Sequence, residues 1–285
     1  MKVKIAAIVL LISFAGNVNA QNRRQDLEYV QKGEFGITAG LAHYFGDLNT
    51  RASISRPKPA IGAFFRKQFG NYVGLRLSAH YAQVGFSDIY SKNDYQKTRN
   101  LSFNSNIWEV ALQGDFNFFK FVPTNPDYIF TPYITLGVGV FTYDPYAYTN
   151  GKKEFLRPLG TEGQLVGYNG RKPYSTLAMC IPLGVGFKYN LSEKINFSFE
   201  LAHRFTTTDY LDDVSTTYAP LSSFLPLSTA ALLQDRSVEV DPDNPINVAP
   251  GGTRQRGWSK QRDQYIIAEI GLTYNISTYR CPTAK

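Results

Sequence analysis

Long apolar runs are almost absent from this sequence of 285 residues. One run, residues 5–15, lies near the N-terminus and is too short to cross a bilayer as a helix. Elsewhere no run approaches the roughly 18 apolar residues that a transmembrane helix requires, which excludes a helix-anchored membrane protein. The mean hydropathy of −0.25, taken alone, is typical of a water-soluble chain.

Cysteine is also scarce, with Cys180 and Cys281 as the two in the chain. Two cysteines do not make the disulfide framework of a small secreted scaffold. The sequence has no CxxC or HExxH motif and no cluster of Cys and His at metal-ligand spacing. We therefore expect neither a metal nor any other cofactor.

Charge of one sign does not accumulate in any segment. Lys and Arg number 30 against 23 Asp and Glu, a formal net charge of +7, and Lys2 and Lys4 supply two of the positive charges. A nucleic-acid partner would need a basic run, and the chain has none. The positive excess predicts no more than a mild attraction to anionic lipid headgroups.

Residues 1–20 have the three parts of a secretory signal peptide. Lys2 and Lys4 form the charged start, residues 5–15 form the apolar centre, and Val18-Asn19-Ala20 supplies the small residues before the cleavage point. Cleavage after Ala20 predicts a mature chain that begins at Gln21. A buried N-terminal strand or helix is the alternative for this segment.

Aromatic residues and glycine are abundant. The chain has 19 Tyr, 20 Phe and 23 Gly. Apolar and polar residues alternate with a period of two in eight segments of barrel-strand length. These segments are residues 34–45, 60–69, 72–86, 108–118, 129–143, 176–188, 195–204 and 265–274. On an exported chain this pattern predicts a membrane β-barrel, because only alternate residues of each strand meet lipid.

The connections between these segments alternate in length. Short ones are residues 70–71, 120–128 and 190–194, and long ones are residues 46–59, 87–106, 144–174 and 207–262. Outer-membrane barrels have short periplasmic turns and long extracellular loops, and an even strand count returns both termini to the periplasm. The sequence therefore predicts an all-β, eight-stranded antiparallel up-and-down transmembrane barrel over residues 33–276. Periplasmic segments 21–32 and 277–285 are expected at its ends.

The sizes of the side chains decide which face of each strand points inward. A soluble lipocalin has the same strand arrangement with apolar residues inside, but one face here has too many large apolar residues to fit an eight-stranded interior. The other face is mostly Gly, Ser, Thr and Ala, with cations and carboxylates that could pair inside a narrow lumen. The predicted ion-pair network consists of Arg66, Arg76, Glu109, Asp115, Lys188, Glu200, Arg204 and Glu269.

An interior filled with side chains predicts that solutes do not diffuse through the barrel, because a porin needs roughly 16 strands. The lumen charges could instead form a proton path or a ligand site, but structural packing is the simpler interpretation. Aromatic residues near the strand ends predict interfacial girdles. These residues are Tyr44, Phe45, Tyr81, Trp108, Phe118, Phe119, Tyr143, Phe187, Tyr189 and Phe205.

Enzyme activity is not expected. His43 and His203 are predicted to point outward near the outer rim, and His80 inward. A lipid A hydrolase built on a rim histidine would need a serine and a carboxylate beside it, whereas the outward neighbours are apolar. Carboxylates in residues 206–218 could bind a hard cation, but they lack the spacing of an EF-hand loop. Capping at the base of a structured loop is the better interpretation.

The two cysteines are not expected to pair with each other. Cys180 is predicted to lie inside the barrel and Cys281 in the C-terminal tail, which places them too far apart for a disulfide. Cys281 could form a disulfide with a periplasmic partner or mark a contact surface. A free, inert thiol is the alternative.

Three segments of the chain have a recognisable sequence: residues 34–49 (EFGITAGLAHYFGDLN), residues 210–218 (YLDDVSTTY) and Arg280-Cys281-Pro282. They resemble the PorG family, outer-membrane barrels of the type IX (Por) secretion system of Bacteroidota. The resemblance implies a non-enzymatic component of a protein-transport complex. Its partners would be outer-membrane lipids and the periplasmic ring of PorK and PorN, which it would anchor to the outer membrane. The alternative is a general small barrel, similar to OmpA or OmpX, for envelope stability or for adhesion through its long loops.

Overall fold

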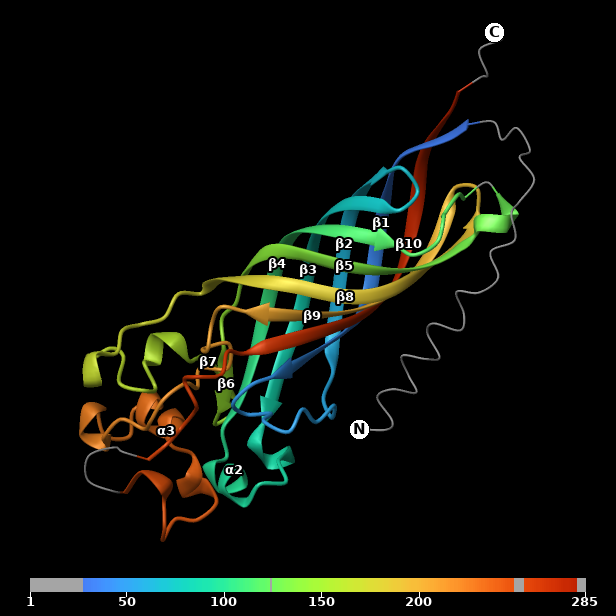
Figure 1. The fold of residues 1–285 in the computed structure, drawn as a ribbon. Coiled ribbons are helices and arrows are strands. Elements are labelled where there is room, and N and C mark those ends of the chain that lie inside the picture. The colour runs from blue at the N-terminus through green and yellow to red at the C-terminus, as the bar shows by residue number, and fades with distance from the viewer. Residues whose placement is uncertain (1–27, 124, 249–253, 281–285) are drawn as a thin grey trace, which may run out of the picture. The chain divides into compact units, whose positions relative to one another are not determined.

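Eight long antiparallel strands form a closed barrel in the computed structural model, which describes residues 28–280 apart from 124 and 249–253. The strands are β1 (Glu28–Phe45), β2 (Lys58–Phe69), β3 (Val73–Ser87), β4 (Ser102–Asn117), β5 (Phe130–Thr142), β8 (Leu177–Ser192), β9 (Ile195–Thr206) and β10 (Gln264–Arg280). Each strand pairs with the next one in this order, and β10 pairs with β1 to close the ring (Figure 1). The predicted fold class is confirmed.

The strands differ from the prediction mainly at their ends. The fourth strand begins at Ser102, several residues before the predicted start, because alternation continues through Phe103 and Ser105 on the buried face. The last strand continues to Arg280 and the first begins at Glu28, outside the expected barrel limits of 33 and 276. The barrel and its loops form one compact unit over Gln31–Ser277. The expected signal peptide, the segment 21–27 and Cys281 lie outside the described residues.

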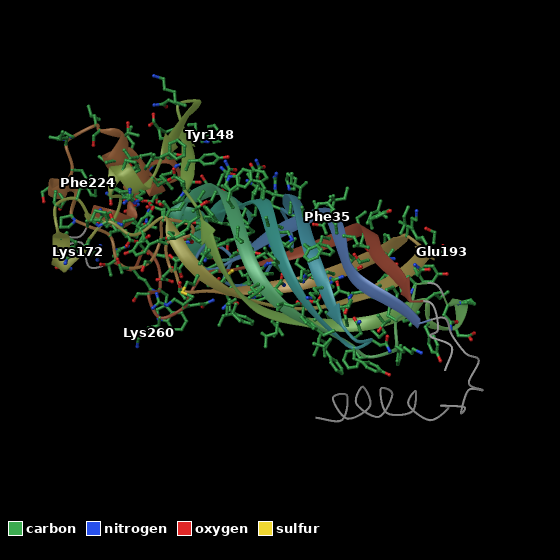
Figure 2. The ribbon with its side chains drawn as sticks, turned by 90° about the horizontal axis from the view of Figure 1, so that it is seen from above. Phe35, Tyr148, Lys172, Glu193, Phe224 and Lys260 are labelled. Carbon is green, nitrogen blue, oxygen red and sulfur yellow. The ribbon has the colours of Figure 1, made fainter. Side chains whose placement is uncertain are left out.

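The outside of the barrel is apolar. Outward side chains such as Ile37, Trp108 and Leu136 are 59%, 63% and 57% exposed. Their strand neighbours on either side face inward, because successive side chains of a strand point to opposite faces. Phe35 projects outward in Figure 2. A band of this kind would be costly in water and is expected in lipid.

The two ends of the barrel differ. At one end, here called the turn end, short links join β2 to β3, β4 to β5 and β8 to β9. The opposite loop end carries the four long connections, and their described residues within 46–57, 88–101, 143–176 and 207–263 are here called the loop cap.

The loop cap contains an additional hairpin and several short helices. The hairpin consists of β6 (Tyr146–Thr149) and β7 (Lys152–Phe155), and β6 pairs with β4. The helices are α2 (Asp94–Arg99), α3 (Thr229–Gln234), η1 (Asp88–Tyr90), η3 (Arg157–Leu159), η4 (Tyr168–Gly170), η5 (Leu221–Ser223), η6 (Ser237–Glu239) and η7 (Ile246–Val248), while η2 (Pro126–Tyr128) lies at the turn end. Among the described residues, each helix is too short or too polar to cross a bilayer.

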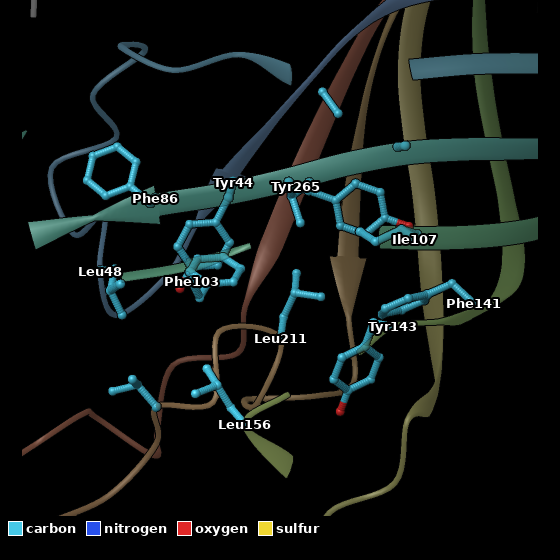
Figure 3. Packing of buried hydrophobic residues seen from close by; sticks show 14 of the residues in the cluster. Tyr44, Leu48, Phe86, Phe103, Ile107, Phe141, Tyr143, Leu156, Leu211 and Tyr265 are labelled. Atoms are coloured by element: carbon cyan, nitrogen blue, oxygen red, sulfur yellow. The ribbon is translucent and has the colours of Figure 1, made fainter. Parts of the chain in front are cut away.

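The hydrophobic core lies at the loop end, inside the barrel mouth and under the loop cap. It contains Tyr44, Phe103, Phe141 and Tyr265 from the strands, with Leu211 from the last loop (Figure 3). The sequence pattern predicts mainly small residues on the inward face. That expectation holds for the middle of the barrel and is wrong at the loop end, where large rings face inward and support the loops.

Candidate functional site

Charged side chains from seven of the eight barrel strands meet in the lumen. The structure brings together every residue of the predicted network, each at most 3% exposed: Arg66, Arg76, Glu109, Asp115, Lys188, Glu200, Arg204 and Glu269. All occupy inward positions of the period-two pattern. β5 contributes hydroxyl groups instead, from Tyr133 and Thr135.

The charges nearer the turn end alternate in sign. Arg66 donates from Nη1 to Glu34 Oε1 at 2.6 Å, and its Nε forms an ion pair with Asp115. Arg76 has its Nε 3.8 Å from Asp115 Oδ1, and its Nη1 donates to Glu200 Oε2 at 2.6 Å. Each interior ion therefore has a counter-charge, as a buried ion requires.

The charges nearer the loop end gather around Glu109. Its Oε2 accepts from Arg204 Nε at 3.3 Å and from the Tyr265 hydroxyl at 2.6 Å. Its Oε1 lies 3.5 Å from His80 Nδ1, and the opposite ring nitrogen lies 3.4 Å from Glu269 Oε2. His80 thus bridges two carboxylates from strands on opposite sides of the ring.

Two members of the network were missing from the predicted set. Glu34 contacts Arg66 and also lies 3.8 Å from Lys188, and His80 bridges Glu109 and Glu269. With Glu34 included, carboxylates outnumber the permanent cations by one, and a protonated His80 would restore the balance. Both residues occupy inward positions of the period-two alternation. The sequence pattern therefore already placed them in the lumen.

The lumen is filled rather than open. Arg66, Arg76 and Arg204 are among the largest fully buried side chains, as are the rings of Tyr133 and Phe141. Side chains that span a narrow barrel and bond to one another leave no aqueous route for solutes. The arrangement can hold the cylinder rigid, and its charges find counter-charges within the lumen.

The loop cap has its own polar centre at Tyr44. The Tyr44 hydroxyl lies 2.5 Å from Asp212 Oδ2 and 2.9 Å from Asp263 Oδ1. One hydroxyl hydrogen can serve only one of these carboxyls. Burial and then repulsion from neighbouring carboxylates raise the pKa of Asp212 and of Asp263 well above the usual range. Protonation of one carboxyl would therefore make both contacts favourable.

Two further acids line the same centre. Asp47 Oδ2 accepts from the backbone of Trp258 at 2.9 Å, and burial raises the pKa of Asp47 to about 6. Asp209 accepts from the Ser215 hydroxyl at 2.6 Å, and burial raises the pKa of Asp209 to about 7. The base of the loop cap is therefore a cluster of carboxyls that favours bound protons.

Two buried arginines connect the loops to one another. Arg99 donates to both oxygens of Asp88, at 2.7 and 2.8 Å, and its Nη2 also reaches the backbone oxygen of Asp47. Arg256 lies 3.3 Å from Glu162, which in turn accepts from the backbone of Ser215. Arg99 Nη1 also donates to the backbone oxygen of Arg256, so these links tie all four long loops into one body. No local sequence pattern predicts the contacts of Arg99 with Asp47 or of Arg256 with Glu162, because these partners lie on different loops.

Carboxylates in residues 206–218 cap loop backbone. Asp212 Oδ1 accepts from Val214 N at 2.9 Å, and Asp213 accepts from the hydroxyls of Tyr174 and Thr161. Over the residues that the structure describes, no group of three or more His, Cys, Asp or Glu is placed to hold a metal. These hydrogen bonds fit the capping interpretation.

His43, His203 and the described cysteine contact other groups of the protein. His43 Nε2 bonds to the backbone oxygen of Ser53, and His203 Nε2 lies 2.6 Å from Gln264 Oε1. His43 faces outward as expected, but the loop after β1 buries it to 3% exposure. Cys180 is buried in the lumen with its Sγ 3.8 Å from Glu109.

Two residues assigned to the girdles lie inside instead. Tyr44 and Tyr143 are buried and bond to the loop cap, so their assignment to a girdle is wrong. The outward rings of Trp108, Phe118 and Phe205 are half exposed, as interfacial residues are.

A closed barrel with an apolar outside and a polar inside is the architecture of bacterial outer-membrane barrels. The chain is a small barrel of that kind.

Solved structures of small outer-membrane barrels resemble the chain at low identity. Neisserial surface protein A is 8% identical with a TM-score of 0.42, covering 86% of this chain and 97% of that one. The N-terminal barrel of Pseudomonas aeruginosa OprF is 11% identical with a TM-score of 0.37, covering 86% and 98%. A major outer membrane protein from Thermus thermophilus is 14% identical with a TM-score of 0.39, covering 86% and 99%.

Comparison with curated proteins finds no match to the sequence. One family model, described as "Domain of unknown function (DUF6089)", matches residues 23–225. This match spans most of the chain, including β1 to β9 and the first part of the last long loop. The chain therefore belongs to the DUF6089 family.

Proposed function

We propose that the protein is a non-enzymatic outer-membrane component of the type IX secretion machinery, which anchors the periplasmic ring of PorK and PorN. The filled lumen is the observation that carries this proposal. Because charged and aromatic side chains occupy the interior and the loop cap covers one end, the barrel suits a scaffold rather than a conduit. The resemblance of residues 34–49, 210–218 and 280–282 to the PorG family supplies the identity of the machine.

Two of these segments pack against each other. Tyr44 of the first bonds to Asp212 of the second, and Leu48 and Leu211 lie in the same core (Figure 3). Segments separated by more than 160 residues thus build one structural unit, the base of the loop cap. Their joint occurrence supports a shared architecture with that family. The segments lie at the loop end and so do not mark the ring contact.

The proposed ring contact lies at the opposite, turn end. Glu193 and Lys194 are exposed in the link between β8 and β9. Figure 2 shows Glu193 and Lys260 at opposite ends of the barrel. The N-terminal segment 21–27 and Cys281 belong to the same proposed periplasmic surface and lie outside the described residues.

Affinity purification from solubilised membranes tests this proposal. With the natural chain as bait, PorK and PorN should be recovered. Charge reversal at the turn end, Glu193→Arg with Lys194→Glu, should reduce recovery, whereas Lys260→Glu at the loop end should not. Consistent absence of ring proteins with an intact, heat-modifiable barrel would refute the anchoring role. Crosslinking from Cys281 in intact cells would then identify which partner, if any, is adjacent.

The second candidate is a general small barrel that stabilises the envelope or adheres to external ligands. Leu225 and Leu227 in the last long loop are 79% and 89% exposed. Exposed apolar side chains of this kind favour a surface of the loop that binds an external partner. The same purification separates the candidates, because an adhesive barrel would be recovered without ring proteins. Shortening residues 221–232 should then reduce surface adhesion while leaving the barrel intact.

A further inference from the structure

An aromatic and basic surface lies on the outer side of the hairpin β6–β7 and the adjoining strand ends. It is here called the hairpin face and consists of Asn104, Tyr146, Tyr148 and Lys153, together with Arg56 and with Lys58, whose Nζ reaches Asn104 from an inward position of β2 opposite Ala42. Tyr146 pairs with Asn104 of β4, and Tyr148 pairs with Lys153 across the hairpin. Since paired residues share a face, the hairpin face continues the outer surface of β4 beyond Trp108. Tyr148 stands on the projecting hairpin in Figure 2.

The cations of the hairpin face are held by neutral groups. Lys153 Nζ lies 3.8 Å from the ring centroid of Tyr146 and 4.7 Å from that of Phe155. Lys58 donates to the Asn104 side chain, and Arg56 lies 4.1 Å over the ring of Tyr90. None of the three forms an ion pair with a carboxylate of the described residues. Asp144 attracts Lys153 only at longer range. The surface therefore retains positive charge for an external anion.

The other face of the same hairpin has a different role. Ala147 points to the loop cap, where it packs in the core with Leu156 and Leu233. Lys152 shares that face, because it pairs with Thr149, and it is exposed at the hairpin tip. Two adjacent lysines thus lie on opposite faces of one short hairpin. Only Lys153 belongs to the basic and aromatic surface.

The height of the hairpin face above the membrane restricts what it can bind. Trp108, whose ring is tilted against that of Tyr81 with their centroids 4.8 Å apart, lies where interfacial aromatic residues do. Asn104 is four residues further along β4, about 10 Å along the membrane normal for a strand tilted by about 40°. A phospholipid headgroup layer is only about 5–8 Å thick. A headgroup of linked sugars extends far enough to reach this surface.

We propose that the hairpin face binds the phosphorylated sugar headgroup of a glycolipid in the outer leaflet. Lys58, Arg56 and Lys153 are placed to donate to phosphate oxygens, a charge-assisted interaction. Asn104 and Asn106 offer amides to sugar hydroxyls, while the rings of Tyr146 and Tyr148 provide flat apolar surfaces for sugar rings. This inference rests on the proposed function only in placing the loop end outside the cell.

Native mass spectrometry of the detergent-solubilised mature protein tests the proposal. The probes are lipid A with two phosphates, the same lipid A after removal of its phosphates, and phosphatidylglycerol. Phosphorylated lipid A should bind at least tenfold more tightly than either of the others. Lys153→Gln should weaken its binding about fivefold, and Lys58→Gln with Lys153→Gln tenfold or more.

Lys152→Gln is the matched control, since it removes the same charge from the opposite face of the hairpin. It should leave lipid A binding unchanged. Equal weakening by Lys152→Gln and Lys153→Gln would overturn the proposal, as would equal binding of lipid A with and without phosphate. Binding of phosphatidylglycerol as tight as that of lipid A would also overturn it, by showing general charge attraction. Retained heat modifiability on gels shows that each variant is folded, and the single Lys153→Gln change lies on an exposed hairpin.

A labelling experiment separates this proposal from the anchoring role. Thr149→Cys at the hairpin tip should react with a membrane-impermeant maleimide in intact cells, beyond the labelling of the natural chain. The variant could be labelled at the surface and the ring proteins recovered, while the protein shows no preference for phosphorylated lipid A. That combination would refute the glycolipid site alone. Labelling only after lysis would refute the orientation on which both proposals depend.

Discussion

At the scale of single residues, the lumen charges are shared between partners. Asp115 lies between Arg66 and Arg76, and Arg66 lies between Asp115 and Glu34. Taking each ion out of water costs several kcal/mol, which only close counter-charges offset. Replacing a whole buried set by apolar residues can be neutral, but removing one member leaves its partners without compensation. The network therefore contributes more to the specificity of the folded arrangement than to its net stability.

Asp115→Asn tests this description, because it keeps the shape of the side chain and removes its charge. We expect a loss of about 3–5 kcal/mol in the free energy of unfolding, since two guanidinium groups lose their shared carboxylate. Urea unfolding of the barrel in lipid vesicles, followed by tryptophan fluorescence, measures it. Asp127→Asn at the exposed turn end is the matched control and should change stability by less than about 0.5 kcal/mol. A similar small effect at Asp115 would contradict the shared-partner account.

At the scale of elements, close pairing of β4 and β5 depends on an inward glycine. A Cβ at Gly137 would lie 2.2 Å from the backbone oxygen of Leu112 and 2.7 Å from Gln113 Cα. Backbone atoms cannot move aside as a flexible side chain would. One rung away, Gly114 pairs with Leu136 and faces outward, and a Cβ there would come no nearer than 3.8 Å to other atoms.

Gly137→Ala and Gly114→Ala therefore form a matched pair on one ladder. Gly137→Ala should cost about 2 kcal/mol or more, because the strands must separate to admit the methyl group. Gly114→Ala should be neutral or slightly stabilising, since alanine restricts the unfolded chain. The fraction of barrel that migrates as the folded form on unheated gels, measured along a urea series, compares the two. Equal stability of both variants would show that the inward clash is relieved without cost.

The hairpin β6–β7 is an element that the period-two pattern did not predict. Residues 144–174 were expected to form a loop, yet Tyr146–Thr149 and Lys152–Phe155 pair around Asn150-Gly151. Both turn residues have positive φ, 50° and 74°, which Asn-Gly adopts readily in two-residue hairpin turns. That dipeptide was a usable signal. Each of the two strands is shorter than a barrel strand, so the period-two pattern did not predict them.

At the scale of the whole molecule, the acid cluster makes the loop cap sensitive to pH. The pKa of Asp47 is raised to about 6 and that of Asp209 to about 7, from 3.8 in the unfolded chain. The folded loop cap therefore binds more protons than the unfolded one at intermediate pH. Its stability is fully present below about pH 4 and falls as the pH rises through 6 and 7.

Hydrogen exchange measures this dependence. After correction for intrinsic rates, backbone amides of residues 209–216 should exchange on the order of tenfold faster at pH 8 than at pH 5. Amides in the middle of β4 serve as the internal control and should not change. Asp212→Asn keeps the shape and removes one ionisable group, so it should reduce the dependence. Faster exchange at pH 5 than at pH 8 would reverse the sign and refute the assigned cause.

The sequence by itself determined the strands, their inward and outward faces and the alternation of short and long connections. Each is a local property, since a period of two places every second side chain on one face of a strand. The inward placement of Arg66, Asp115 and Glu200 followed from the same rule.

Only the tertiary structure decided which of these residues meet. Arg76 and Glu200 are 124 residues apart in the chain, and Tyr44 and Asp212 are 168 apart. Closure of the ring and the paths of four loops bring such pairs within bonding distance. The large rings at the barrel mouth face inward because folded loops bury them there. No local sequence pattern predicts the paths of those loops.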